Sequence, residues 1–92
     1  MKRDELYIRY LYKLHALHMK EENFTEAGFT LIYHSRMFDW SDDEIPAHSK
    51  QIARERYNNV KTQMEVKEAL YNDIIKYFDE AKVRFFSIFK II

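Results

Sequence analysis

The stretch ENFTEAGFTLIYHSRMFDWSDD, residues 22–43, decides the fold that we predict for this chain. A helical pattern begins at Asn23, and its apolar side chains cover most of the circumference. One face carries Phe24, Ala27, Leu31, Ser35 and Phe38, and the apolar surface is widened by Phe29, Ile32, Tyr33 and Met37. A helix of this kind is central and packs against neighbours on two sides. Gly28 should cost it about 1 kcal/mol relative to alanine, and would allow a neighbouring helix to approach closely.

Helix-capping signals lie at both ends of this stretch. Asn23–Glu26 has the spacing of a capping box, and Ser41–Glu44 repeats it as S-x-x-E. Trp40 and Ile45 are placed as the hydrophobic staple of the second box. Pro46 then limits any helix, because proline beyond the first turn removes a backbone donor. Residues 39–48 are therefore predicted to form a turn and loop that begins with a short helical turn.

An amphipathic helix precedes this stretch, capped by Asp4 and running to about Glu21. Its predicted buried stripe consists of Tyr7, Tyr10, Leu11, Leu14, Leu17 and His18, and its polar side of Arg9, Lys13, Ala16 and Lys20. The connection to the central helix is very short, so the two helices should form an antiparallel hairpin.

A long helical pattern comes next, from about Ser49 to Lys82. Its first half, KQIARERYNNVKTQ, is polar, and Asn58 and Asn59 make a break possible; we expect a solvated or mobile extension there. Its second half carries a stripe of Met64, Tyr71, Ile75 and Phe78, with Leu70, Ile74 and Tyr77 beside it. This half should close the hairpin into a three-helix unit. The predicted fold class is all-α, an antiparallel helical hairpin plus a long third helix.

Composition narrows the class of protein. The chain has 92 residues, of which 47% are apolar and 16% aromatic, with only one Gly and one Pro, which favours a single helical domain or a piece of a larger one. Its 15 basic and 15 acidic residues balance, so we expect no nucleic-acid partner. The absence of cysteine fits a cytoplasmic protein. The start resembles no secretory signal, and the apolar end is too short to span a membrane.

No set of residues has the spacing of an active site. His15 and His18 stand at i, i+3, whereas helical metal pairs usually stand at i, i+4, so a helix-surface or interface pair is the favoured interpretation. Glu44 and His48 are separated by Pro46 and indicate no site. Aromatic side chains at helical spacing are typical of a core rather than of base stacking, and KQIARER, residues 50–56, of a solvated helix face rather than a docking site. We therefore predict no catalytic, cofactor-binding or metal-binding residue, and no enzyme.

Several blocks resemble the DOCK family of guanine nucleotide exchange factors, in the opening segment of its catalytic DOCKER (second DOCK homology) region. The similar blocks are ELYIRYLYKL at 5–14, ENFTEAGFTL at 22–31, WSD at 40–42 and KEALYNDIIKYFDEAK at 67–82. The resemblance divides the chain into residues 1–82, a partial DOCKER region, and residues 83–92. There the family pattern would continue with a polar, Trp-containing helix start, and this chain instead has the divergent apolar tail VRFFSIFKII. That tail is predicted either to pack back on the hairpin or to favour self-association.

The resemblance implies a role within a larger protein. In such proteins the first lobe is a helical array that serves dimerisation and support. Two further lobes hold a Rho-family GTPase, which by resemblance would be Rac-like, and expel its nucleotide and magnesium. This chain would therefore lack the catalytic lobe and be inactive alone, with a homodimer or a DOCK-type chain as its partner. The alternative is a tetratricopeptide-like helical scaffold, although no 34-residue repeat is present.

Overall fold

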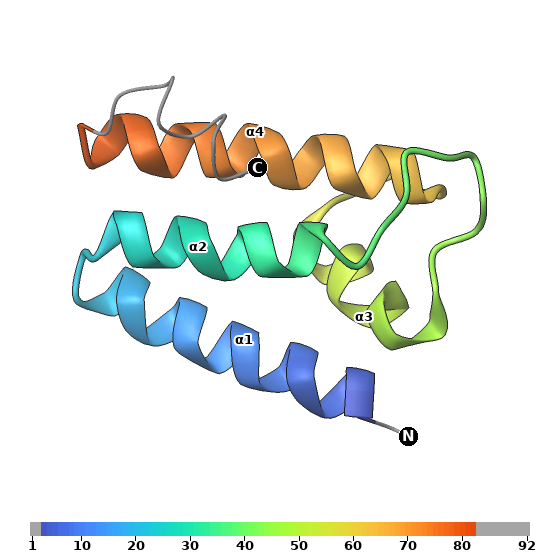
Figure 1. The fold of residues 1–92 in the computed structure, drawn as a ribbon, viewed down its shortest axis with the longest axis horizontal. Helices are drawn as coiled ribbons and strands as arrows, with labels where there is room; N and C mark the ends of the chain where they lie inside the picture. Colours follow the sequence, from blue (N-terminus) through green and yellow to red (C-terminus); the bar gives the residue numbers. More distant parts are fainter. Residues whose placement is uncertain (1–2, 83–92) are drawn as a thin grey trace.

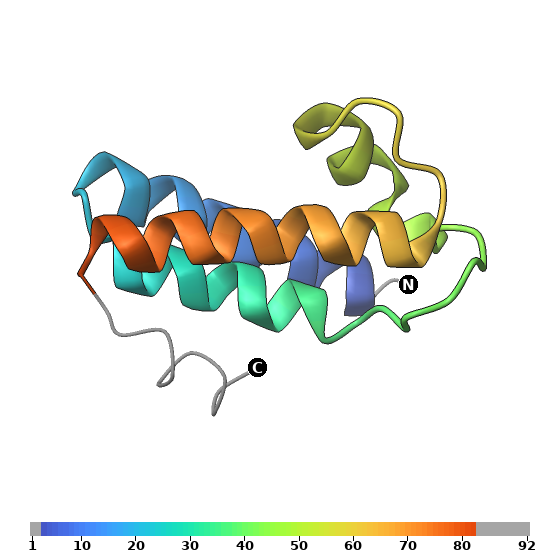
Figure 2. The same cartoon turned by 90° about the horizontal axis from the view of Figure 1, so that it is seen from above.

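The computed structural model describes residues 3–82, and these fold into four α-helices with no strand longer than a single bridge. The helices are α1 (Arg3–Lys20), α2 (Phe24–Ser35), α3 (Ala47–Arg56) and α4 (Gln63–Glu80). α2 lies between α1 and α4 and packs on both (Figure 1), and α3 lies on one side of this three-helix layer, against α1 (Figure 2). The predicted all-α class and the central position of α2 are confirmed. The tail predicted at 83–92 lies outside the described residues.

The α1–α2 hairpin is confirmed, but its capping differs from the prediction. Asn23 is the N-cap of α2 and its side chain makes no capping bond. The Asn23 N–H donates to the carbonyl of His18 (2.7 Å), and the Glu22 N–H to that of Met19 (3.1 Å), with Glu22 at φ 58°. This is a Schellman motif that ends α1. Because it already uses the Asn23 N–H, Glu26 has no donor left to complete a capping box.

The predicted buried face of α2 is confirmed except at Phe24, which is half-buried, and Tyr33, predicted to widen it, is exposed. Gly28 explains how closely α4 packs on this face. Ala27, Leu31, Ser35 and Phe38 are buried. A Cβ added at Gly28 would lie 3.1 Å from Cε1 of Phe78 on α4. The missing side chain therefore makes room for that ring. Leu31 and Phe78 belong to the main hydrophobic cluster, together with Ile32, Phe38, Ile45, Ala53, Val66, Leu70 and Ile74.

The buried face of α1 differs from the predicted stripe. Ile8, Leu11 and His15 are its buried residues, whereas Tyr10 and Leu17 are 60% and 53% exposed. α1 has two neighbours, α2 and α3, and together they cover a side that is rotated from the predicted stripe. The prediction failed because Tyr7 and Tyr10 fit the apolar periodicity of the helix although they lie on its exposed side. The four residues predicted to be polar and outward, Arg9, Lys13, Ala16 and Lys20, are all exposed.

The predicted loop after α2 is confirmed, but its helical turn at Ser41–Glu44 is not. Glu44 instead forms an antiparallel bridge with Thr62, and the N–H groups of Gln63 and Met64 donate to the carbonyls of Asp43 (2.9 Å) and Ser41 (3.0 Å). The loop backbone thus satisfies donors in the first turn of α4, which a helical turn at the same residues could not do. The staple is also wrong, because Trp40 is exposed and packs on Tyr71 (ring centroids 5.2 Å apart).

The prediction of one long third helix was wrong, because the break that Asn58 and Asn59 made possible is present in the structure. The chain leaves helix between Arg56 and Gln63, where Asn59 has φ 69°, so α3 and α4 are separate. α4 begins with a capping box at Thr62–Glu65 that was not predicted. α3 is no solvated extension: Ser49 and Ala53 are fully or nearly fully buried.

The stripe of α4 was displaced in the same way as that of α1. Its buried residues are Val66, Leu70, Ile74 and Phe78, which recur every fourth position, whereas Ile75 is exposed. Phe78 of the predicted stripe is buried, and so are Leu70 and Ile74, which were predicted beside it. The buried face is thus centred on the side of α4 that α2 covers. No helix within residues 3–82 has the length and apolar character needed to cross a membrane.

Candidate functional site

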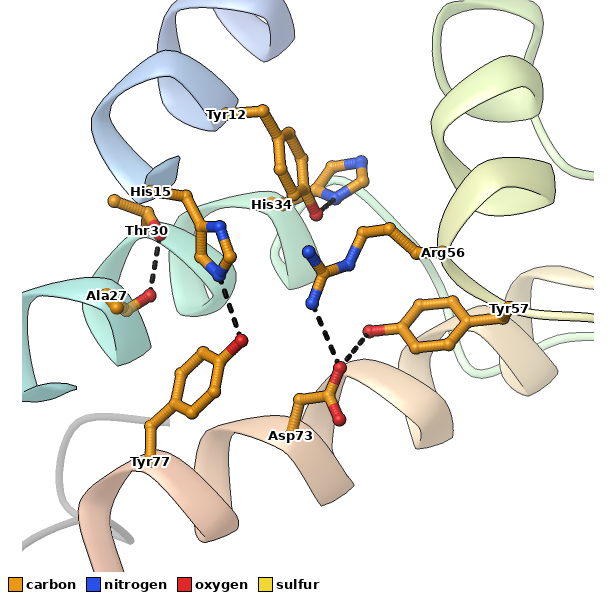
Figure 3. A network of polar contacts seen from close by, with 9 residues as sticks. All are labelled: Tyr12, His15, Ala27, Thr30, His34, Arg56, Tyr57, Asp73 and Tyr77. Carbon is orange, nitrogen blue, oxygen red and sulfur yellow. Dashed lines mark hydrogen bonds and ion pairs between the residues drawn. The ribbon is translucent and has the colours of Figure 1, made fainter. Parts of the chain in front are cut away.

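The most organised polar feature is a buried network that joins all four helices (Figure 3). It has three parts: a chain of hydrogen bonds through His34, an ion pair between Arg56 and Asp73, and a contact between His15 and Tyr77. Buried polar groups are costly unless they are paired. The pairing, protonation and access of these groups decide whether the network can do chemistry or only holds the helices together.

The first part runs from α1 through α2 to α3. Tyr12 Oη lies 2.7 Å from His34 Nδ1, His34 Nε2 lies 2.9 Å from Ser49 Oγ, and that oxygen lies 2.7 Å from His48 Nδ1. Burial first, then the nearby His48 and Arg56, lower the pKa of His34 to about 3. The imidazole is therefore neutral at pH 7 and has one donor and one acceptor nitrogen.

The direction of these hydrogen bonds follows from the acceptor that the Tyr12 hydroxyl hydrogen can reach. If Tyr12 donates to His34 Nδ1, then His34 Nε2 donates to Ser49, and Ser49 donates to His48. In the reverse direction the Tyr12 hydroxyl hydrogen would have no acceptor among the described residues. We therefore assign the hydrogen of His34 to Nε2. Burial raises the pKa of Tyr12, which is consistent with a phenol that keeps its proton.

The second part joins the end of α3 to α4. Arg56 Nη2 donates to Asp73 Oδ2 (3.0 Å), and Tyr57 Oη donates to the same oxygen (2.6 Å). The guanidinium also lies over the rings of Tyr12 (5.3 Å) and Tyr57 (5.5 Å). Burial works against the charge of Arg56, but hydrogen bonding to Tyr57 outweighs it and the pKa of Arg56 is raised.

The third part joins α1 to the last turns of α4. His15 Nε2 lies 3.0 Å from Tyr77 Oη. Burial, followed by the charge of Arg56, lowers the pKa of His15 to about 4. The interface interpretation of His15 is thus confirmed. His18 is half-buried between α1 and α2, and its Nδ1 has no hydrogen-bond partner among the described residues.

The network contains a serine and a histidine in contact, as a catalytic pair would, but a substrate has no access to them. A serine hydroxyl beside a histidine nitrogen can act as a nucleophile and base. Here, however, Ser49 is 0% and His34 1% exposed, so no substrate can reach them. No group of three or more His, Cys, Asp or Glu within residues 3–82 could hold a metal ion. The network can hold helices together; it offers no reaction centre.

Glu44 and His48, which were judged from the sequence to indicate no site, have separate partners in the structure. Glu44 forms an exposed ion pair with Lys50, whose hydrogen bond and charge lower the pKa of Glu44. His48 contacts Ser49 instead, as the outer end of the network. His34 and Asp73 were not predicted from the sequence. The one available signal was that each is a polar residue close to a buried apolar one. His34 stands three residues after Leu31, and Asp73 stands one residue before Ile74.

A second feature is an apolar groove between α1 and α2, on the side of α1 away from α3. Its volume is about 400 Å³, and it is lined by Tyr7, Tyr10, Leu11, Leu14, His18, Glu26, Phe29, Thr30 and Tyr33. The groove collects most of the stripe that was predicted to be buried on α1. Tyr10 and Tyr33 on its walls are large side chains that remain exposed. Apolar side chains from two helices are thus gathered on one open face of the molecule.

Known proteins resemble this chain along most of its length. The family model described as DHR-2, Lobe A matches residues 1–88. The chain is 35% identical over 82 residues to dedicator of cytokinesis protein 4 of Homo sapiens, and that alignment covers 89% of the chain and 4% of the relative. It is 34% identical over 80 residues to dedicator of cytokinesis protein 3 of Mus musculus, covering 87% of the chain and 4% of the relative. The chain thus spans about 4% of the length of these relatives.

Proposed function

The chain belongs to the DHR-2 Lobe A family, and on that premise we propose that it is the first-lobe segment of a DOCK-type guanine nucleotide exchange factor. The substrate of the parent protein would be a Rho-family GTPase of the Rac kind, in signalling to the actin cytoskeleton. The segment would be residues 1–82, with 83–92 as a separate tail. This boundary stays a prediction, and the family match runs past it to residue 88.

The proposed role of the segment is dimerisation and support, with exchange carried out elsewhere in the parent protein. The observation that carries it is the exposed apolar surface. Leu6 and Leu17 on α1 and Ile75 on α4 are exposed although the same helices bury other apolar residues, and none of the three lines the α1–α2 groove. Such surface suits contact with further helices or with a second chain. The polar network supports this role too, because its pairs join helices.

A cytoplasmic location is part of the proposal. It is supported by the lack of cysteine in a chain with buried aromatic and aliphatic side chains. A chain without cysteine has no need of an oxidising compartment for its stability.

The main test is a chimera. Residues 1–82 would replace the matching segment in the exchange region of human dedicator of cytokinesis protein 4, and release of fluorescent GDP from Rac would be measured. We expect exchange close to that of the unaltered region. The same chimera carrying Leu31→Asp is the control and should lose activity, because Leu31 is fully buried. A well-folded chimera without activity would contradict the proposal and favour the tetratricopeptide-like scaffold.

Two measurements on the isolated chain complete the test. The 92-residue chain should leave the intrinsic rate of GDP release from Rac unchanged, and accelerated release would overturn its proposed dependence on other lobes. Light scattering after size exclusion should show a defined dimer if the chain carries dimerisation contacts itself. A monomer at all concentrations would restrict its role to support.

A further inference from the structure

The apolar groove between α1 and α2 runs from the hairpin connection towards the N-terminal end of α1. His18 and Glu26 lie at its connection end, and Tyr7 and Tyr33 at the other. Tyr7 and His18 are eleven positions apart on one helix, a length of about 16 Å. Glu26 is exposed and is the acidic residue of the groove lining.

The C-terminal end of α4 lies beside the connection end of this groove. Figure 1 shows that α4 ends at the same end of the molecule as the α1–α2 connection. The ring of Phe78 contacts that of Phe29, with centroids 5.6 Å apart, and Phe29 lines the groove. Lys82 stands four residues after Phe78, about 6 Å further along a helix. Lys82, the last described residue, therefore stands about one helical turn after Phe78, whose ring contacts a residue of the groove lining.

The backbone at Lys82 has the left-handed conformation that ends a helix. The Lys82 N–H donates to the carbonyl of Asp79 (3.0 Å) and φ of Lys82 is 64°. A left-handed residue at this position ends a helix and changes the direction of the chain. Glu22 has the same conformation (φ 58°) at the end of α1, and there the chain folds back antiparallel as α2.

The ten residues after Lys82 have the composition of a groove ligand. Seven of them are apolar: Val83, Phe85, Phe86, Ile88, Phe89, Ile91 and Ile92. The two charged ones, Arg84 and Lys90, are basic and thus complementary to Glu26. Ten residues reach about 33 Å when extended and about 15 Å as a helix, so the segment can cover the groove in either form.

We propose that residues 83–92 occupy the α1–α2 groove of their own chain. The tether favours this occupant over a second copy, because a short connection gives an effective concentration of about millimolar. Burial of two aromatic side chains would remove about 300–500 Å² from water. The basic side chains would lie at the rim near Glu26. This inference is independent of the exchange-factor role.

Disulfide trapping in the full chain tests the proposal, since the natural sequence has no cysteine. Ser87→Cys leaves the apolar residues of the segment intact, and it is paired with Tyr10→Cys, whose position is exposed on the groove wall. The matched control pairs Ser87→Cys with Gln51→Cys, an exposed position in the cleft between α1 and α3. A second groove variant, Glu26→Cys, guards against a local effect of losing Tyr10.

We expect an intramolecular disulfide in the groove pairs to form about tenfold faster than in the control pair, independently of protein concentration. Equal rates in groove and control pairs would overturn the proposal. A disulfide that links two chains in preference would also overturn it, and would assign the groove to a second copy. Circular dichroism of each reduced variant verifies that α1–α4 are retained.

Charge reversal gives an independent measurement. Glu26→Lys in the Tyr10→Cys/Ser87→Cys background should slow trapping about two- to fivefold, as expected for loss of an exposed charge pair. Glu21→Lys, at an exposed position outside the groove lining, is the matched control and should leave the rate unchanged. Equal slowing by both substitutions would contradict a specific contact at Glu26.

Discussion

Asp73 joins α4 to the end of α3 by accepting hydrogen bonds from both Arg56 and Tyr57. Its side chain is 22% exposed and that of Arg56 is 20% exposed, whereas the second ion pair, Lys50–Glu44, is exposed to solvent. Removing one partner of a partly buried pair leaves the other charge less well compensated.

We predict that Asp73→Ala lowers the free energy of unfolding by about 2–3 kcal/mol. Urea denaturation followed by circular dichroism measures this loss. Glu44→Ala removes the exposed pair and is the control, with no measurable change expected. Similar small effects of both substitutions would show that Arg56 finds solvent when Asp73 is absent.

Gly28 is a second position where one residue determines packing. Alanine would gain about 1 kcal/mol of helix propensity. Its Cβ, however, would meet Cε1 of Phe78 at 3.1 Å, and that ring is 1% exposed and packed against Phe29. Because the ring is buried against Phe29, we expect overpacking to outweigh the gain in propensity.

The expected result for Gly28→Ala is a net loss of about 1 kcal/mol in stability, measured by thermal denaturation. In a Phe78→Leu background the same substitution should become neutral or stabilising, because the smaller side chain removes the clash. A double-mutant cycle gives the coupling between the two positions. Additive effects would mean that Phe78 does not restrict Gly28.

At the scale of helices, α3 is held through polar contacts more than through apolar area. It buries only Ser49 and Ala53, and its bonds to the layer run through His34 on α2 and Asp73 on α4. The groups that face His34 are Tyr12 from α1 and His48 and Arg56 from α3. None of them supplies a negative charge that would favour protonation of His34.

This arrangement predicts a loss of stability in acid. The folded-state pKa of His34, about 3, is below the ordinary value of 6.5. The unfolded chain therefore binds a proton as the pH falls below 6.5, while the folded chain does not until about pH 3. At pH 5 this difference costs about 2 kcal/mol for His34 alone, and the lowered pKa of His15 acts in the same direction.

Melting temperature measured from pH 7.5 to pH 4.5 should fall steadily below about pH 6.5. His34→Gln should be less stable at neutral pH and show a shallower fall, since the substituted side chain cannot titrate. An equal slope in both proteins would assign the acid loss to other groups. Amide exchange should show that α3 opens before α2 and α4.

At the scale of the whole molecule, the fold depends on α2, which is the one helix packed on both sides within residues 3–82. Leu31 is its fully buried centre. Leu31→Asp places an unpaired charge in the core, at a cost that approaches the total stability of a small domain. We expect loss of the helical circular dichroism signal and of the thermal transition. Tyr33→Asp, two residues away on the exposed side of the same helix, is the control and should remain folded.

Much of the helical organisation followed from local patterns. The apolar circumference around Leu31 predicted the central helix, the short segment before Asn23 predicted the hairpin, and Asn58–Asn59 marked the break. The faces of α1 and α4 did not follow, because Tyr10 and Ile75 satisfy the same periodicity as Ile8 and Ile74. Periodicity identifies an apolar set, but which part of it is covered depends on where α3 folds.

The polar network could not be predicted from the sequence either, because its hydrogen-bond partners are distant along the chain. Tyr12 and His34 are separated by 22 residues, Arg56 and Asp73 by 17, and His15 and Tyr77 by 62. By itself, the sequence determined that this chain is helical and that its second helix is central, since these depend on neighbours along the chain. It indicated a possible break at Asn58 and Asn59 but not that α3 and α4 are separate helices. Only the tertiary structure decided which polar residues are buried, because a buried histidine or arginine is stable only beside partners that folding brings from other helices.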